Sequence, residues 1–264
     1  MLVEPRFIPV LLLADGRLVK TTQFSMPEYV GDPINVLSIF NEFVVDEIII
    51  LDIAAARSRQ HVPFQELRLF AEECFIPLAY GGGLTTTEQM GELFNAGFEK
   101  AVVNTLLADD PAVVEAAAHR FGSQAVVASI DVRGEPGERR VVTRGGAAVV
   151  SDSPADWARR AVDLGVGEIL VTSVDREGTG QGFDLPLVSE VVAAVGVPVV
   201  AHGGARRRSD LALPVIQSGA SSVAAGSLFV FQGRNRGVLI NYPPRVQVEK
   251  ILRSTEEPIL GSGV

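Results

Sequence analysis

The two halves of this chain repeat each other. PLAYGGGL begins at residue 77 and returns as PVVAHGGA at residue 198, 121 residues later. DEIIILDI at 46–53 returns in the same way as GEILVTSVD at 167–175. Repetition at a fixed offset indicates a duplicated half. Because each copy alternates apolar runs with helical stretches, two copies predict one (β/α)8 barrel, whose sites lie at the carboxyl ends of its strands.

The length and composition fit a single domain. A chain of 264 residues is close to the roughly 250 that such a barrel needs. Its hydrophobic content of 47% indicates a large core, and no linker interrupts the midpoint. We therefore expect an α/β fold, a single (β/α)8 TIM barrel over residues 1–253. Its homologous (β/α)4 halves are expected at about 1–124 and 125–253, and residues 254–264 are expected to form a flexible tail.

Charge and cysteine usage narrow the class of protein. The net charge of −9 argues against a nucleic-acid-binding surface, although backbone N–H groups at helix N-termini could still bind phosphate. The single cysteine, Cys74, excludes an internal disulfide and a zinc-binding thiol cluster, which favours the cytoplasm. No apolar run is long enough to cross a bilayer. We expect no metal, no cofactor, no nucleic-acid partner and no membrane partner.

Apolar, β-branched runs bounded by Gly, Pro or Asp mark the strands. The predicted strands are 6–13, 46–53, 76–80, 100–104, 125–131, 167–173, 198–202 and 222–226. Helical patterns between them include 63–74, 86–97 and 153–165, the last with Ser153 as its N-cap. Residues 133–152 interrupt the alternation of strands and helices. Their pattern, VVTR–GG–AAVV, predicts a hairpin inserted after the fifth strand. The insertion fits a functional loop and a plain surface loop equally well.

Four predicted strands carry a charged residue at or next to their first position. Residues two apart on a strand share a face, so each charge starts a row that continues apolar. These charges are Arg6, Glu47, Lys100 and Glu168. If the rows face inward, two cations and two anions meet across the bottom of the barrel. Buried charges need partners, which favours a closed ring of salt bridges over four solvated rim charges.

The opposite ends of the strands carry small and polar residues. Glycine allows close backbone approach, while hydroxyls and helix N-termini donate to phosphate oxygens. The repeat places such turns on opposite sides of the mouth, which predicts a long ligand with a phosphate at each end. The residues expected to bind these phosphates are Gly83, Asn104, Thr105, Gly204, Ala225, Gly226 and Ser227.

Several titratable residues are candidates for chemistry. Asp131 ends the fifth strand, where it could act as a general acid/base or cap a loop. Lys20, predicted in the loop after the first strand, could position an anion or be solvated. His202 ends a strand beside two glycines and is a better candidate than His61 or His119. Further candidates for hydroxyl or phosphate contacts are Asp52, Thr172, Asp175, Glu177 and Gly178.

A set of motifs points to a family. They are DGRLVK at 15–20, GDP at 31–33, DEIIILDI at 46–53, VVNT at 102–105, RFGSQ at 120–124, ID at 130–131 and DREGTGQGFD at 175–184. With them, residues 6–231 resemble the cyclase subunit of imidazole glycerol phosphate synthase, the HisF barrel of histidine biosynthesis. The resemblance implies a doubly phosphorylated ribulosyl substrate. It also implies ammonia delivered through the barrel from a HisH-like glutaminase subunit at the N-terminal face.

The resemblance also assigns roles to residues. The four charges at or next to the strand starts match the family's gate at the entrance of the ammonia tunnel, and Glu99 beside them is available to the partner. The family's two catalytic aspartates end the first and fifth strands. The second is Asp131, but the first aligns with Leu12, which cannot transfer a proton, so our catalytic candidates are Asp131 and Lys20. Further departures are Glu177 in the DRDGT turn, His202 in place of a small residue, and the ending FVFQGRNRGVLINYP.

Three functions follow from this pattern. We favour the ammonia-conducting barrel of a glutamine amidotransferase pair, because LLL in the first strand, PLAYGGG and the ending resemble a paralogous branch associated with acetamidino modification of surface sugars. There, a separate ATP-dependent amidotransferase uses the ammonia. The second function is a genuine cyclase with an altered acid/base set, which forms imidazole glycerol phosphate and AICAR. The third is a phosphate-binding scaffold or a phosphosugar isomerase. Leu12 and the gate both count against the isomerase.

Overall fold

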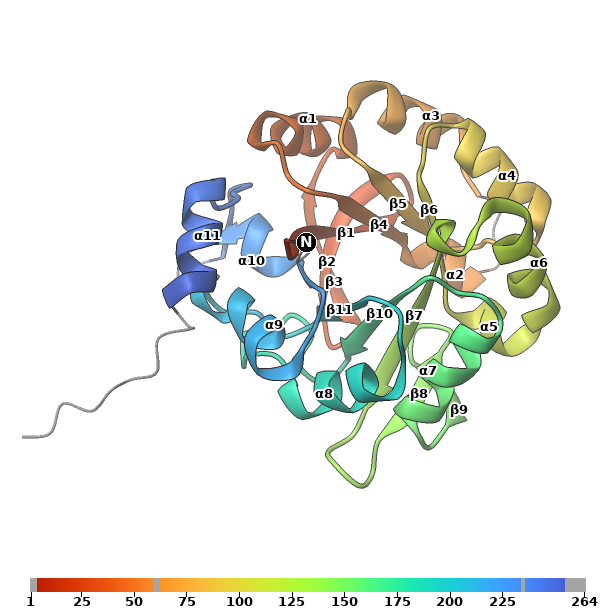
Figure 1. Cartoon of the computed structure of the whole chain (residues 1–264). Helices are drawn as coiled ribbons and strands as arrows, with labels where there is room; N and C mark the ends of the chain where they lie inside the picture. The colour runs from red at the N-terminus through yellow and green to blue at the C-terminus, as the bar shows by residue number, and fades with distance from the viewer. Residues whose placement is uncertain (1–3, 59–61, 234–235, 255–264) are drawn as a thin grey trace, which may run out of the picture.

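The computed structural model describes residues 4–58, 62–233 and 236–254. Parallel strands follow one another around a ring in chain order, and the pairing of β12 with β1 closes it. Figure 1 shows the helices arranged outside this ring. The barrel strands are β1 (Arg6–Ala14), β4 (Ile48–Asp52), β5 (Leu78–Gly81), β6 (Lys100–Val103), β7 (Val126–Arg133), β10 (Glu168–Ser173), β11 (Val199–His202) and β12 (Ser222–Ala225). The predicted (β/α)8 barrel is confirmed.

The helices lie between the strands, as the sequence predicts. The helices are α1 (Pro33–Phe43), α2 (Ile53–Ser58), α3 (Phe64–Glu73), α4 (Thr87–Asn95), α5 (Thr105–Asp109), α6 (Pro111–Phe121), α7 (Pro154–Asp163), α8 (Leu185–Ala194), α9 (Leu213–Ser218), α10 (Ser227–Val230) and α11 (Arg245–Ser254). Short 3-10 helices are η1 (Ser123–Ala125) and η2 (Arg208–Ala212). The predicted N-cap of α7 is confirmed, because the Ser153 hydroxyl accepts the Asp156 N–H at 3.1 Å. No described helix is long and apolar enough to cross a membrane.

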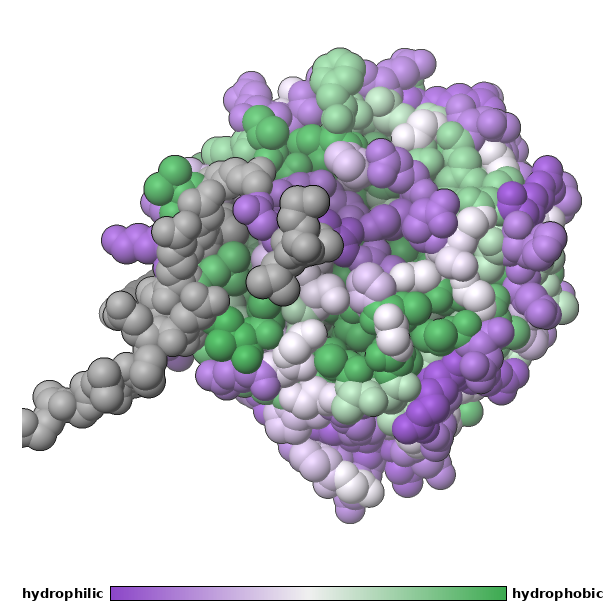
Figure 2. All heavy atoms as spheres, in the orientation of Figure 1, coloured by the Kyte–Doolittle hydropathy of each residue, from purple (hydrophilic) through white to green (hydrophobic). Residues whose placement is uncertain are grey.

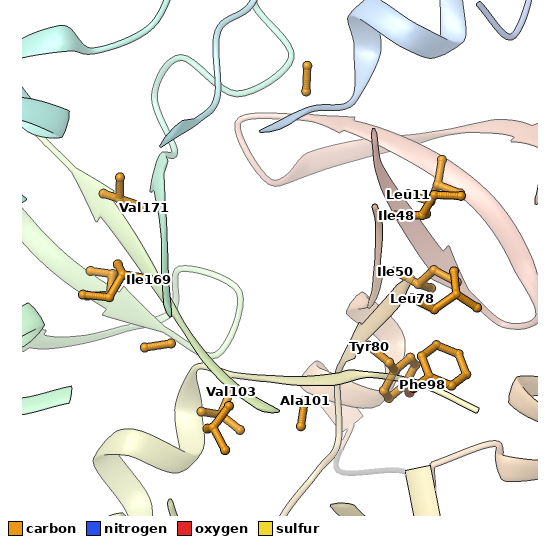
Figure 3. Packing of buried hydrophobic residues seen from close by; sticks show 14 of the residues in the cluster. Leu11, Ile48, Ile50, Leu78, Tyr80, Phe98, Ala101, Val103, Ile169 and Val171 are labelled. Atoms are coloured by element: carbon orange, nitrogen blue, oxygen red, sulfur yellow. The ribbon is translucent and has the colours of Figure 1, made fainter. Parts of the chain in front are cut away.

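Alternate residues on the strands fill two separate cores. Outward-facing side chains such as Ile50, Val103 and Ile169 pack in the layer between the sheet and the helices (Figure 3). The residues between them, such as Val102 and Leu170, fill the interior of the barrel. This alternation follows from the two-residue period of a strand. It therefore decides which side chains can reach a ligand inside the barrel and which hold the helices in place.

Two hairpins extend strands beyond the carboxyl end of the barrel. β2 (Arg17–Thr22) folds back antiparallel on β1 and pairs with β3 (Ser25–Gly31). The prediction that Lys20 lies in a loop is therefore wrong, because Lys20 lies on β2. The insertion at 133–152 forms the predicted hairpin, with β8 (Arg140–Thr143) antiparallel to β9 (Ala148–Ser151).

The chain after β12 returns to the amino end of the barrel. A short hairpin, β13 (Phe231–Gln232) with β14 (Gly237–Val238), follows α10. Beyond it, the Tyr242 hydroxyl donates to the Phe7 carbonyl of β1 at 2.8 Å, so this segment ends at the amino end of the first strand. Apart from Ser254, which ends α11, the predicted tail lies outside the described residues.

Candidate functional site

A cavity of about 570 Å³ opens at the carboxyl ends of the barrel strands. Its walls come from loops after the strands and from both hairpins. The predicted site residues that line it are Leu12, Asp52, Gly83, Asn104, Thr105, Asp131, Thr172, Glu177 and His202. The fold therefore brings together residues that lie far apart in the sequence, at the end of the barrel where strand direction predicts a site.

Asp131 is the most strongly perturbed carboxyl group in the cavity. Its side chain is buried and accepts hydrogen bonds from Ser129 Oγ at 3.3 Å and Asn104 Nδ2 at 3.2 Å. Burial raises the pKa of Asp131 to about 7, because desolvation disfavours the charged form more than these donors favour it. A carboxyl group that is partly protonated near neutral pH can act as either acid or base.

Leu12 faces the cavity from β1 and belongs to the interior core with Val10. Lys20 is buried as well, and its Nζ donates to the Val10 carbonyl at 3.4 Å. Burial lowers the pKa of this lysine. A Cβ atom at Gly226 would lie 1.9 Å from Nζ, so the glycine leaves the space that the lysine fills. Lys20 is not one of the residues lining the cavity.

His202 and Thr172 lie on neighbouring strands and touch. Thr172 Oγ1 is 3.2 Å from His202 Nδ1. Burial, with the nearby charge of Lys20, lowers the pKa of His202 to about 3, so the imidazole is neutral at physiological pH. The Thr172 hydroxyl therefore faces an uncharged imidazole, which can donate or accept a hydrogen bond.

Asp52 is held from two sides at the end of β4. Its Oδ1 accepts the Ala55 N–H at 2.8 Å, at the start of α2, and its Oδ2 accepts the Tyr80 hydroxyl at 3.5 Å. Burial raises the pKa of Asp52, and it also raises the pKa of Tyr80. Sequence reasoning missed Tyr80; the only available signal was an aromatic hydroxyl in an otherwise aliphatic strand.

The loop after β10 packs against the β2–β3 hairpin. The Glu177 carboxylate accepts the Thr21 hydroxyl at 3.1 Å, and a Cβ at Gly178 would lie 2.4 Å from the Thr21 carbonyl. Asp175, in contrast, is exposed, and its Oδ2 accepts the Gly134 N–H at 2.7 Å. Glu177 therefore reaches the cavity, while Gly178 and Asp175 contact the two hairpins and are not among the lining residues.

Of the two expected phosphate sites, one opens into the cavity. Gly83, Asn104 and Thr105 line it, whereas the turns after β11 and β12 do not. A Cβ at Gly204 would lie 2.1 Å from the Gly182 carbonyl, so that turn is packed against the chain itself. The other expected residues outside the lining are Ala225, Gly226 and Ser227. The Ser227 hydroxyl is buried without a hydrogen-bond partner in the described structure.

The inserted hairpin supplies a cation that sequence reasoning missed. Arg144 and Gly145 line the cavity. The Arg144 N–H donates to Thr105 Oγ1 at 3.2 Å, and its Nη2 pairs with Asp109 at 2.7 Å. The hairpin is therefore part of the cavity wall. The sequence signal was the VVTR–GG turn itself, because residues at a turn tip can point back toward the barrel mouth.

The opposite end of the barrel carries the predicted ring of charges. Lys100 Nζ lies 2.8 Å from Glu47 Oε2 and 2.7 Å from Glu168 Oε2, and Arg6 pairs with the same two carboxylates. Cations and anions therefore alternate around a closed ring at the amino ends of the strands. The glutamates are nearly fully buried, with side chains 3% and 7% exposed. Glu99, next to Lys100, is exposed.

Comparison with known proteins identifies the family. Residues 6–235 match the family model described as histidine biosynthesis protein. The chain is a HisF-like member of this family. It is 46% identical over 243 residues to a putative imidazole glycerol phosphate synthase subunit hisF2 of Pseudomonas aeruginosa, covering 92% of this chain and 97% of the relative. It is also 39% identical over 229 residues to the imidazole glycerol phosphate synthase subunit HisF of Alkaliphilus metalliredigens, covering 86% and 91%.

A third relative is a putative imidazole glycerol phosphate synthase subunit HisF of Leptospira interrogans. It is 39% identical over 252 residues, which cover 95% of this chain and 99% of the relative. The alignment with this relative thus covers nearly the whole HisF-like chain. In the orientation of Figure 1, hydrophilic residues gather over the centre of the barrel, with hydrophobic residues beside them (Figure 2).

Proposed function

We propose that this HisF-like barrel is the synthase half of a glutamine amidotransferase pair. A glutaminase subunit docks below the ring of Arg6, Glu47, Lys100 and Glu168. Ammonia passes through the ring and along the barrel interior to the cavity. From there it is used for acetamidino modification of a surface sugar, with a separate ATP-dependent amidotransferase. We place this reaction in the cytoplasm, where the unpaired Cys74 is stable.

The observation that carries this proposal is the closed ring of ion pairs. Four charges concentrated at one end of a barrel are unusual, since that end is normally filled by apolar side chains. Desolvating them is costly, and equally well-packed apolar residues would be as stable or more so. Stability therefore does not explain the ring, whereas passage of a small neutral molecule does. The alternating ring carries no net charge, and it can open when one ion pair separates.

The second support comes from the cavity above the ring. The raised pKa of Asp131 suits acid/base work near neutral pH. Leu12, however, supplies an apolar side chain where the family resemblance expects the other catalytic carboxylate, the one that ends the first strand. A barrel that keeps its gate and loses half of its acid/base pair is suited to delivering ammonia rather than closing an imidazole ring. The resemblance of its first strand and its ending to the acetamidino-associated branch favours that acceptor.

Replacing Lys100 by alanine tests ammonia passage in the complex with the glutaminase. Glu47 and Glu168 would then share Arg6 alone, and the ring would have a gap. We expect glutamine hydrolysis to continue while more ammonia escapes. The measurement is the ratio of glutamate formed to nitrogen delivered to a nucleotide-sugar acceptor, together with the ammonia released into bulk solution. That ratio should rise clearly above the wild-type value.

A matched control removes an exposed cation instead. Arg68 pairs with Glu92 at 3.0 Å on the helical surface, and both side chains are largely exposed. Arg68→Ala should leave the ratio unchanged, because exposed ion pairs contribute about 0–1 kcal/mol and this pair lies outside the ring. An unchanged ratio in Lys100→Ala, or a wild-type barrel that binds no glutaminase, would make the ring a structural feature only.

The alternative function is a genuine histidine-pathway cyclase, which the raised pKa of Asp131 favours. The two functions differ in the ammonium-dependent cyclisation of the ribulosyl phosphate intermediate. With Leu12 in place, we expect this rate to be about 10²–10⁴-fold below that of an enzyme with both groups. Leu12→Asp should recover a measurable part of it. Turnover at ordinary enzyme rates by the unmodified chain would establish the cyclase instead.

A further inference from the structure

Thr172 joins two buried titratable side chains across three neighbouring strands. In the strand register it lies opposite Asp131 of β7 on one side and opposite His202 of β11 on the other. Its Oγ1 is 3.2 Å from His202 Nδ1, and its hydroxyl is close enough to the Asp131 carboxyl group to favour the ionised form. All three side chains are buried and line the cavity. They therefore lie in one row across the strands, with the hydroxyl between the carboxyl group and the imidazole.

The far end of this row is available to a ligand. His202 Nδ1 faces Thr172, whereas Nε2 has no hydrogen-bond partner within the described part of the protein. Because His202 lines the cavity, Nε2 is the nitrogen that a bound molecule could reach. Leu12 also lines this cavity and has no group that could exchange a proton there.

We propose that His202 Nε2 is a second proton-transfer position for Asp131, connected to it through the Thr172 hydroxyl. When Asp131 is ionised, His202 Nδ1–H donates to Thr172, and Thr172 donates to Asp131. A proton accepted at Nε2 from a ligand displaces the Nδ1 proton to Thr172, whose own proton moves to Asp131. The result is a protonated Asp131 and a neutral His202 that carries its hydrogen on Nε2; the reverse sequence returns the proton.

The electrostatic surroundings favour this coupling. The charges that act on the pair are Lys20 from β2, Glu177 from the loop after β10, and Arg133 from β7. Burial and Lys20 keep His202 neutral, since they lower its pKa to about 3, while the pKa of Asp131 is about 7. The imidazole therefore changes tautomer rather than charge when Asp131 gains or loses its proton.

This inference goes beyond the proposed function, because it gives the cavity a second acid/base position on another strand, which a cyclase with Leu12 in place of a carboxylate would need. Its test needs neither glutaminase nor acceptor, so the two proposals can fail separately. The probe is the free protein with 15N-labelled histidine, observed by NMR from pH 5.5 to 8.5. The chain has three histidines, and His61→Gln and His119→Gln variants assign the signals.

We expect the hydrogen of His202 to move from Nε2 to Nδ1 as the pH rises, with a midpoint near 7, while the ring stays neutral. Thr172→Val removes the connecting hydroxyl and should abolish this change, and Asp131→Asn should abolish it by removing the titration. Thr172→Ser keeps the hydroxyl and should retain the change. This variant also shows whether a loss in Thr172→Val reflects the missing hydroxyl rather than a disturbed fold.

Ser129→Ala is the matched control. It also removes a hydroxyl that donates to Asp131, but Ser129 lies on β7 and makes no hydrogen bond to His202 in the described structure. The tautomer change should persist in this variant, with its midpoint moved to higher pH because the ionised carboxylate loses a donor. A wild-type His202 that keeps one tautomer throughout, or a change that survives in Thr172→Val, would overturn the proposal.

Discussion

Burial determines the chemistry of individual residues in and beside the cavity. Asp131, Asp52 and Lys20 lie where water is excluded, and in each case desolvation is the largest cause of the pKa shift. The ionised form is disfavoured every time: the carboxyl pKa values rise and the lysine pKa falls. The ionisation of Asp131 is therefore costly in the folded state, and this cost must appear in the stability of the protein.

Asp131→Asn should stabilise the folded protein at pH 8 more than at pH 5. The folded-state pKa is about 7, whereas the unfolded value is about 4, so the folded chain holds a proton that the unfolded chain has lost within this window. The contribution of Asp131 to the free energy of unfolding is therefore greatest below pH 4, and it falls as the pH rises to 7. A tenfold difference in acidity between the folded and unfolded states corresponds to about 1.4 kcal/mol, and asparagine resembles the protonated acid.

The measurement is the free energy of unfolding in urea at both pH values. The gain in Asp131→Asn relative to wild type should be larger at pH 8. Asp163→Asn is the control, because Asp163 is exposed on α7 and its replacement should change stability little at either pH. Equal effects of Asp131→Asn at pH 5 and pH 8 would mean that Asp131 is not perturbed by burial.

At the scale of elements, strand parity predicted the most. Alternation alone placed Arg6, Glu47, Lys100 and Glu168 on the inward rows, and the repeat alone predicted the barrel and its order of strands. The first inference depends on the two-residue period of a strand and the second on repetition at a fixed offset, and a sequence displays both directly. Strand boundaries were predicted less well. β4 was predicted from residue 46 but begins at Ile48, whose N–H donates to the Pro77 carbonyl.

The β1–β2 hairpin was missed although its turn was visible. Asp15 and Gly16 both have positive φ, 49° and 71°, as a two-residue hairpin turn requires, and Asp–Gly is a strong signal for it. The predicted loop hid the burial of Lys20, which depends on long-range packing beside Gly226. The contact of Tyr80 with Asp52 likewise depends on which strands become neighbours. Such contacts join segments that no local pattern connects, so sequence alone could not supply them.

At the scale of the whole molecule, the chain's last described segment braces its first strand. The Tyr242 hydroxyl donates to the Phe7 carbonyl at 2.8 Å and lies 3.4 Å from Asp46 Oδ2, which also accepts the Phe7 N–H. Phe7 and Asp46 adjoin Arg6 and Glu47 in the sequence, so this contact lies next to the ring of charges. Closure of the barrel by β1 and β12 is thus reinforced from outside, at the end where a partner is proposed to dock.

Tyr242→Phe should lower the free energy of unfolding by about 1–2 kcal/mol, the usual effect of removing a buried hydrogen bond. Phenylalanine keeps the ring contact with Phe229, whose centroid lies 5.2 Å away, so the loss isolates the hydroxyl. Tyr29→Phe is the matched control, since Tyr29 is 61% exposed and its replacement should leave stability nearly unchanged. Denaturant unfolding measures both. If the two variants lose equally little, the barrel is closed by its strands alone and the Tyr242 hydroxyl adds nothing to the end that carries the ring.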